Sequence, residues 1–319
     1  LKIRANIAIG CRFTDVLSTD FIYLYDEFQL NVYGYDARQS NESIAIQRIK
    51  DNFSEYIGKE YVRRDFSKED KEAVTEMAEK IIEVFKERIN KLDWMSDETK
   101  AEAVKKLDTM KIKVGYPDEW DEEDKTSSNN DLDIRSPEEG GTYFSNQIAV
   151  NRAVREARVA LQGKPVDKTG WAISIFEVNA LYDSGNNDIS FPAAFLQKPV
   201  YDPEQSYEYN LGSIGYAIAH EVTHAFDNDG ALYDENGNIS NWWTDEDYAA
   251  FEKLCDKAVK AYDGYEYVQG ITTNGKMTLS ENVADLGAVA CLIDMLSEME
   301  DPAYDELFRI VFQTMTFFT

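Results

Sequence analysis

Histidine and cysteine are scarce in this sequence, and their scarcity limits the kinds of site that the chain can form. The 319 residues include two histidines and three cysteines. The cysteines, Cys11, Cys255 and Cys291, are odd in number and widely spaced, which argues against a disulfide framework and against a Cys-x-x-Cys metal site. We expect all three to be buried thiols.

Basic residues and long apolar runs are scarce as well. The chain has 33 lysine and arginine residues against 60 aspartate and glutamate residues, for a formal net charge of −27. This charge repels phosphate backbones and anionic lipid surfaces, so we expect no nucleic-acid partner. No apolar run approaches the roughly 18 residues that a membrane span requires, and residues 1–4 do not open a signal peptide. We therefore expect no membrane segment in this chain.

Apolar content and helical periodicity predict a folded, mainly helical protein. Hydrophobic residues make up 43% of the chain, and its length is sufficient for two domains with a large core. Ser67 is expected to cap a long amphipathic helix, and Thr244 the helix at 245–262. Ser96 is expected to cap another helix, whose apolar stripe is formed by Ala101, Val104, Leu107 and Met110. Helices are predicted over much of 1–60, at 67–91, 96–114, 143–161, 214–224, 245–262 and 279–296, and from 304 to the end.

A small β part interrupts the helices in the second half of the chain. Residues 178–182 and 188–191 are predicted to form two short strands, joined by a turn-rich connection. The expected fold class is therefore mainly α with a small β part (α+β). We expect one region at 1–165, which is helical, and a second at 166–319, with the acidic loop at 117–142 typical of a boundary region.

One stretch of the second region carries the pattern of a zinc site: His220-Glu221-Val222-Thr223-His224. On a helix, positions four apart lie on the same face, so the two imidazoles reach a single point. Glu221 lies beside the first histidine, where its carboxylate can contact a water on the metal. Two histidines placed at random in this chain would fall four apart in roughly 1 of 160 arrangements, which makes coincidence the weaker interpretation.

A catalytic zinc takes three protein ligands and leaves one position for water. Since the chain has no third histidine, we expect the third ligand to be a carboxylate, and Glu281 is the best candidate. Glu281 and Asp285 are four apart on a predicted apolar helix, so one can bind the metal while the other accepts a hydrogen bond from a ligand imidazole. Asp227, three residues after His224, is a second candidate to orient a ligand.

Further motifs surround these residues. They are Val178-Asn179-Ala180-Leu181-Tyr182, Phe191-Pro192-Ala193-Ala194-Phe195-Leu196-Gln197, Trp242-Trp243-Thr244, Leu92-Asp93-Trp94-Met95 and Gly115-Tyr116-Pro117-Asp118. Together with the HEVTH stretch, its continuation Ala225-Phe226-Asp227 and the stretch Glu281-Asn282-Val283-Ala284-Asp285, they resemble the neprilysin and endothelin-converting-enzyme family of zinc endopeptidases. The resemblance covers most of the chain from about Tyr61 onward.

The resemblance implies a complete set of roles at the metal. His220, His224 and Glu281 would be the ligands of one zinc ion per chain, and Glu221 the general base for a zinc-activated water. Asp285 would orient a histidine. The second region would be a thermolysin-like catalytic lobe, and residues 1–165 part of the family's helical lobe.

The resemblance also implies a peptide substrate. Asn179 and the backbone of Ala180 would bind the substrate backbone as an added strand. The enzyme would act as an endopeptidase on small to medium peptides and cut before apolar residues. The family's apolar pocket for the residue after the cut corresponds loosely to Phe195, Val200, Tyr216 and Ala217.

Family members are about twice as long as this chain, so we expect it to be a fragment that works with the remainder of its own longer polypeptide. The family's C-terminal segment supplies an oxyanion-stabilising histidine, and both histidines here are assigned to zinc. Two alternatives to an active endopeptidase follow: a zinc-binding but catalytically incomplete peptide-binding fragment, and a structural protein with an accidental HExxH. The few cysteines suit a cytoplasmic protein, or a bacterial cell-surface or secreted protein without disulfides.

Overall fold

The computed structural model of the chain describes residues 18–34, 40–120, 132–300 and 304–318. The chain forms two compact units, the first from residues 1–57 and 119–166 and the second from residues 58–118 and 167–319. The sequence-based division at residue 165 into a helical and a catalytic lobe stays a prediction. By packing, residues 58–118 belong with the second unit, which also contains every residue assigned to the zinc site.

The first unit is helical within its described residues. Helix α7 starts with a capping box, in which Thr142 and Ser145 accept hydrogen bonds from each other's backbone N–H groups. The elements are α2 (Thr19–Tyr33), α3 (Asn41–Asn52), the first turn of α4 (Ser54–Asp65), the 3₁₀ turn η2 (Pro137–Glu139) and α7 (Tyr143–Ala160).

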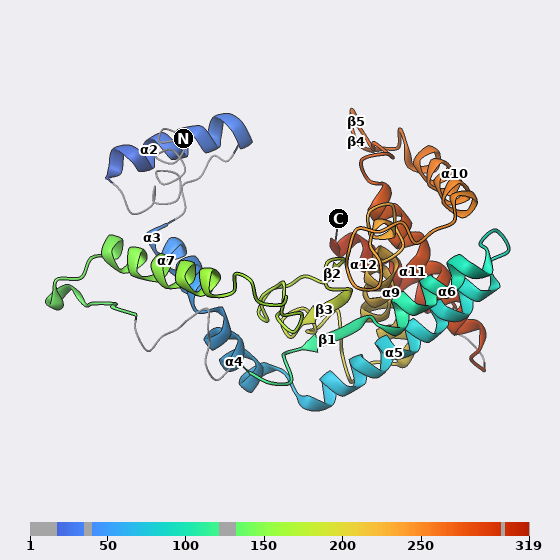
Figure 1. The fold of residues 1–319 in the computed structure, drawn as a ribbon, viewed down its shortest axis with the longest axis horizontal. Coiled ribbons are helices and arrows are strands. Elements are labelled where there is room, and N and C mark those ends of the chain that lie inside the picture. The colour runs from blue at the N-terminus through green and yellow to red at the C-terminus, as the bar shows by residue number, and fades with distance from the viewer. Residues whose placement is uncertain (1–17, 35–39, 121–131, 301–303, 319) are drawn as a thin grey trace. The chain divides into compact units, whose positions relative to one another are not determined.

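The second unit is built from helices that pack beside a small sheet (Figure 1). Its helices are the rest of α4, α5 (Lys68–Lys91), α6 (Asp97–Asp108), α8 (Tyr207–Asn210), α9 (Tyr216–His224), α10 (Asp245–Tyr262), α11 (Leu279–Ser297) and α12 (Tyr304–Phe318), with the π-helical turn η3 (Leu211–Gly215) and the 3₁₀ turn η4 (Gly230–Leu232). Its strands are β1 (Lys111–Gly115), β2 (Leu181–Asp183), β3 (Asp188–Pro192), β4 (Glu266–Val268) and β5 (Ile271–Thr272).

The helix starts follow the sequence closely. The side chains of Ser67, Ser96 and Thr244 accept backbone hydrogen bonds at the first turns of α5, α6 and α10, as predicted. The described fold is mainly α with a small β part, which confirms the predicted fold class. No helix among the described residues is both long and apolar enough to cross a bilayer.

Strand β1 corrects the prediction that the helix beginning at Ser96 continues to Val114. Helix α6 ends at Asp108, and Lys111–Gly115 pairs in parallel with β3. Strand β2 pairs antiparallel with the other side of β3, so the sheet order is β1-β3-β2. Every residue of β3 is buried, which is expected of a central strand covered on both faces.

The core of the second unit lies between α5, α9, α11 and the sheet. Helix α5 buries one apolar face formed by Val74, Met77, Ala78, Ile81, Ile82, Phe85 and Ile89. Helices α9 and α11 pack closely against each other and both contact α5. Cys255 and Cys291 are buried free thiols, as expected, whereas Cys11 lies outside the described residues.

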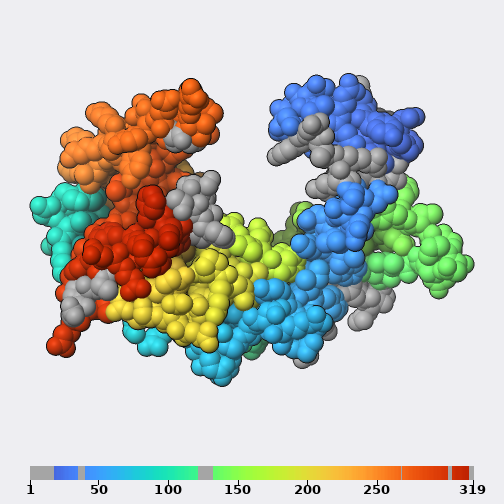
Figure 2. All heavy atoms as spheres, turned by 180° about the vertical axis from the view of Figure 1, so that it is seen from behind, coloured from blue at the N-terminus to red at the C-terminus, as the bar shows by residue number. Residues whose placement is uncertain are grey.

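Helix α12 covers the start of the segment that leads into α9. It packs on η3, where a side chain at Gly212 would lie 3.0 Å from Cβ of Ile310. Figure 2 shows α12 in red against the yellow segment around residue 200. The chain entering α9 is therefore packed on one side by α12 and on another by α5.

Candidate metal centre

Helix α9 presents both histidines of the chain on one face. Residues Tyr216–His224 form the helix, and the described side chains other than His220 and His224 are buried. The histidines are one turn apart and are each partly exposed, so they turn from the core toward a cavity. Their placement agrees with the face predicted from the i, i+4 spacing.

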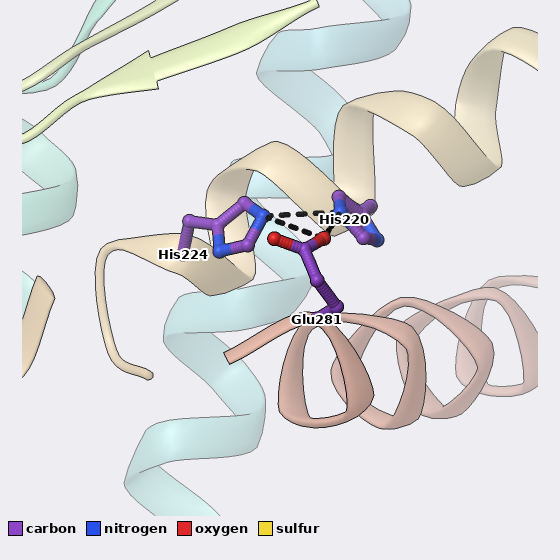
Figure 3. Close-up of side chains that lie close together, drawn as sticks. All are labelled: His220, His224 and Glu281. Atoms are coloured by element: carbon purple, nitrogen blue, oxygen red, sulfur yellow. Dashed lines mark hydrogen bonds and ion pairs between the residues drawn. The ribbon is translucent and has the colours of Figure 1, made fainter. Parts of the chain in front are cut away.

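Helix α11 brings Glu281 to the same point (Figure 3). The Nε2 atoms of His220 and His224 are 3.0 Å apart. Oε2 of Glu281 lies 3.2 Å from Nε2 of His220 and 3.7 Å from Nε2 of His224. Three ligands about 2.0–2.1 Å from a tetrahedral zinc would be about 3.3 Å from one another, so this triangle of donors fits zinc.

Two aspartates hold the opposite nitrogens of the imidazoles. Nδ1 of His220 lies 2.9 Å from Oδ1 of Asp285, and Nδ1 of His224 lies 2.6 Å from Oδ2 of Asp227. Each aspartate therefore fixes the tautomer that leaves Nε2 as the electron-pair donor. Of the two orienting candidates, the structure places one on each histidine.

The charges around the imidazoles favour a cation. Burial, the largest single influence, lowers the pKa of His220, but hydrogen bonds to Asp285 and Glu281 outweigh it and raise that pKa to about 10. For His224, burial again acts to lower the pKa, and the hydrogen bond to Asp227 reverses the direction. The hydrogen bond from His220 lowers the pKa of Glu281. Without a metal, these interactions therefore favour the protonated imidazoles, whose positive charge lies where a zinc ion would place its own.

Glu221 lies beside His220 but outside the donor triangle. Its side chain is buried and lines the same cavity as the histidines. Burial raises its pKa, while the positive charge of His224 and His220 opposes the shift. A carboxyl group in this position can exchange a proton with a molecule in the cavity.

The cavity has a volume of about 580 Å³ and is lined by residues of β2, α9 and α11. Asn179 and Ala180, assigned to the substrate backbone, lie on its wall directly before β2, which is an edge strand of the sheet. The side chain of Asn179 is exposed and accepts a hydrogen bond from the backbone N–H of Ala180. Among the residues assigned to an apolar pocket, Phe195, Tyr216 and Ala217 line the cavity, and Val200 does not.

The polar roles of three residues near the site were not identified from the sequence. Tyr216 and Ser280 donate hydroxyl hydrogen bonds to the two aspartates. Lys106 is fully buried in α6 and donates to the backbone oxygens of Ala225, Gly230 and Tyr233, in the loop after α9. The apolar stripe predicted for this helix is right for Leu107 and Met110, which are buried, and wrong for Ala101, which is exposed. Ala103 and Lys106 are buried in addition.

Comparisons with known proteins point to one family. Two models of peptidase family M13 match residues 8–117 and 179–310, which together make up more than half of the chain. The neutral endopeptidase of Lactobacillus helveticus is 36% identical over 277 residues, which are 87% of this chain and 41% of that protein. The second matched segment contains both histidines and Glu281.

Solved structures give the same result. The crystal structure of PepO from Lactobacillus rhamnosis matches with a TM-score of 0.82 and 31% identity, over 94% of this chain and 46% of that chain. The zinc metalloprotease ZMP1 of Mycobacterium tuberculosis, in complex with an inhibitor, matches with a TM-score of 0.74 and 28% identity, again over 94% and 46%. The chain spans about half the length of the relatives that it matches. It belongs to peptidase family M13, the neprilysin family of zinc metalloendopeptidases.

Proposed function

We propose that this chain carries the zinc centre and the substrate-binding edge strand of an endopeptidase that hydrolyses small to medium peptides. The observation that carries the proposal is the donor triangle of His220, His224 and Glu281, whose edges measure 3.0, 3.2 and 3.7 Å. We assign these three residues as the ligands of one zinc ion. A bound zinc would polarise the scissile carbonyl and lower the pKa of a water molecule.

Glu221 is proposed as the general base. It is the buried carboxylate of the cavity wall that belongs to α9, immediately after the first ligand. It would accept a proton from the attacking water and pass that proton to the amine that leaves. Burial raises its pKa, which keeps the protonated form accessible for the second of these steps. Asp285 and Asp227 would hold the imidazoles in place during the reaction.

Substrate binding is assigned to the edge of the sheet. A peptide lying along β2 could form backbone hydrogen bonds with Ala180 and contact the exposed amide of Asn179. The side chain after the scissile bond would enter the part of the cavity lined by Phe195, Ala217 and the ring of Tyr216. These walls are apolar, which supports cleavage before apolar residues.

The test is the cleavage of internally quenched peptides by the 319-residue chain, with zinc and then with a chelator. We expect chelator-sensitive cleavage before apolar residues. Glu221→Gln should retain zinc and lose at least about 10³-fold in turnover, because the base is removed and the ligands are kept. Glu252→Gln, an exposed glutamate of α10, is the matched control and should retain activity.

Two outcomes would contradict the proposal at different points. Near-complete activity of Glu221→Gln would remove Glu221 from its role as the base. One zinc per chain without any cleavage would support the other candidate, a zinc-binding but catalytically incomplete peptide-binding fragment. That candidate draws its support from the chain's share of its relatives' length, which is about half.

A further inference from the structure

Each aspartate that orients a ligand histidine shares one oxygen between that histidine and a hydroxyl group. Oδ1 of Asp285 accepts from the hydroxyl of Tyr216 and lies 2.9 Å from Nδ1 of His220. Oδ2 of Asp227 accepts from the hydroxyl of Ser280 and lies 2.6 Å from Nδ1 of His224. The same arrangement thus occurs twice, once on each imidazole.

We propose that Tyr216 and Ser280 are positioning residues of the metal centre, which set its zinc affinity by holding the two aspartates. This inference rests on the proposed zinc site and adds two residues to it. An aspartate side chain can rotate about two bonds, and a carboxylate that turns toward water no longer orients its imidazole. A second donor on the shared oxygen restricts that rotation, because it satisfies the carboxylate in the orientation that faces the histidine.

The two hydroxyls also connect the elements that carry the ligands. Tyr216 lies on α9, one turn before His220, and reaches across to Asp285 on α11. Ser280 lies on α11, beside Glu281, and reaches to Asp227 in the loop after α9. The two bonds therefore cross between the histidine segment and the Glu281 helix in opposite directions. These bonds therefore link the helix of Glu281 to the segment that carries His220 and His224.

The two aspartates differ in what else holds them, so the hydroxyls should differ in effect. Asp227 also accepts backbone hydrogen bonds at Oδ1 from Asp229, at 2.8 Å, and Gly230, at 2.7 Å. Asp285 accepts only from Tyr216 and His220 within the described part of the chain. Loss of the Tyr216 hydroxyl should therefore free Asp285 to rotate more than loss of the Ser280 hydroxyl frees Asp227.

The experiment measures the zinc dissociation constant of the 319-residue chain by competition with a chelator. Tyr216→Phe removes only a hydroxyl from a ring that is 3% exposed, and we expect it to weaken zinc binding about tenfold. Ser280→Ala should weaken binding less, by about threefold, and Ser280→Thr should restore it because the hydroxyl returns. Tyr209→Phe and Ser297→Ala are the controls, since their hydroxyls bond to backbone oxygens away from the site.

A spectroscopic measurement separates positioning from general stability. The chain has only two histidines, so their ring nitrogen resonances can be assigned from single variants. We expect faster exchange of the Nδ1 proton with water at His220 alone in Tyr216→Phe, and at His224 alone in Ser280→Ala. A variant that merely loosened the fold would change both histidines together.

The results distinguish failure of the positioning role from failure of the proposed metal site. Zinc affinities of Tyr216→Phe and Ser280→Ala within twofold of the unchanged chain would overturn the inference, as would equal losses in the two controls. Failure of the unchanged chain to bind one zinc ion would instead overturn the proposed metal site itself. Site-specific loss, in the order Tyr216→Phe then Ser280→Ala, supports the positioning role.

Discussion

At the scale of single residues, Lys106 is the most unusual group near the metal centre. Its ammonium donates to three backbone oxygens of the loop that follows α9, at 2.7–2.8 Å. Burial lowers its pKa to about 8, while the charges of Asp227, Asp234 and Glu235 act in the opposite direction. The lysine therefore has a structural use that offsets the cost of its burial: it satisfies carbonyl groups in the loop that contains Asp227.

Lys106→Met should lower the free energy of unfolding by on the order of 3 kcal/mol, because the methionine has a similar shape and leaves the backbone oxygens of Ala225 and Tyr233 without a donor. Chemical denaturation at pH 7 measures this change. Lys105→Met is the matched control, since the side chain of Lys105 is 51% exposed and forms ion pairs with Glu102 and Glu235 at the surface. A loss below about 0.5 kcal/mol in Lys106→Met would contradict the structural role.

The same lysine predicts a dependence on pH. The folded chain releases the Lys106 proton near pH 8 and the unfolded chain near pH 10.5. Between these values the unfolded state binds more protons, so the contribution of this group to stability rises with pH. We expect the difference in unfolding free energy between the unchanged chain and Lys106→Met to widen between pH 8 and pH 10.5. A difference that narrowed over this range would mean that the folded-state pKa is not lowered.

At the scale of elements, the contact between α9 and α11 fixes where Glu281 meets the histidines. Gly287 of α11 faces Thr223 of α9 so closely that an added Cβ would lie 2.4 Å from Oγ1 and 2.5 Å from Cγ2 of the threonine. Thr223 is itself buried and bonded to the backbone of Ala219. Glycine at this position therefore sets the separation of the two helices that carry the ligands.

Gly287→Ala should separate α9 from α11, lower the melting temperature and weaken zinc binding, as measured by thermal unfolding and chelator competition. Adding Thr223→Ala removes both of the closest atoms, and we expect the double variant to recover much of the zinc affinity. Gly170→Ala is the control, because no atom lies within 4 Å of its added Cβ. Zinc affinity unchanged in Gly287→Ala would show that this contact does not position Glu281.

Elements differ in how well the sequence predicts them, for physical reasons. The starts of α5, α6 and α10 depend on a local backbone N–H that donates to the side chain of Ser67, Ser96 or Thr244, and local signals can be read from sequence. Strand β1 depends on pairing with β3, more than 70 positions later in the chain, and no local sequence pattern indicates such a partner. The spacing of His220 and His224 predicted their common face. The hydroxyls of Tyr216 and Ser280 gained their partners only through helix packing.

At the scale of the whole molecule, the proposed metal centre joins segments that are distant in the sequence. His220 and His224 belong to α9 and Glu281 to α11, and both helices pack on α5 from the first half of the chain. An unfolded chain holds the two histidines near each other but not Glu281. Zinc should therefore bind the folded state much more tightly, and its binding free energy should add to the stability of the second unit.

Removal of zinc should consequently lower the melting temperature. Free zinc at about 1,000 times its dissociation constant stabilises a folded protein by about 4 kcal/mol, which corresponds to roughly 8–16 °C for a unit of this size. Calorimetry in zinc buffers and in chelator measures the shift, and hydrogen exchange should show protection gained in 216–224 and 279–297. In Glu281→Ala, which lacks the distant ligand, the melting temperature should change far less when zinc is removed. An equal melting temperature with and without zinc would mean that the metal does not join these helices.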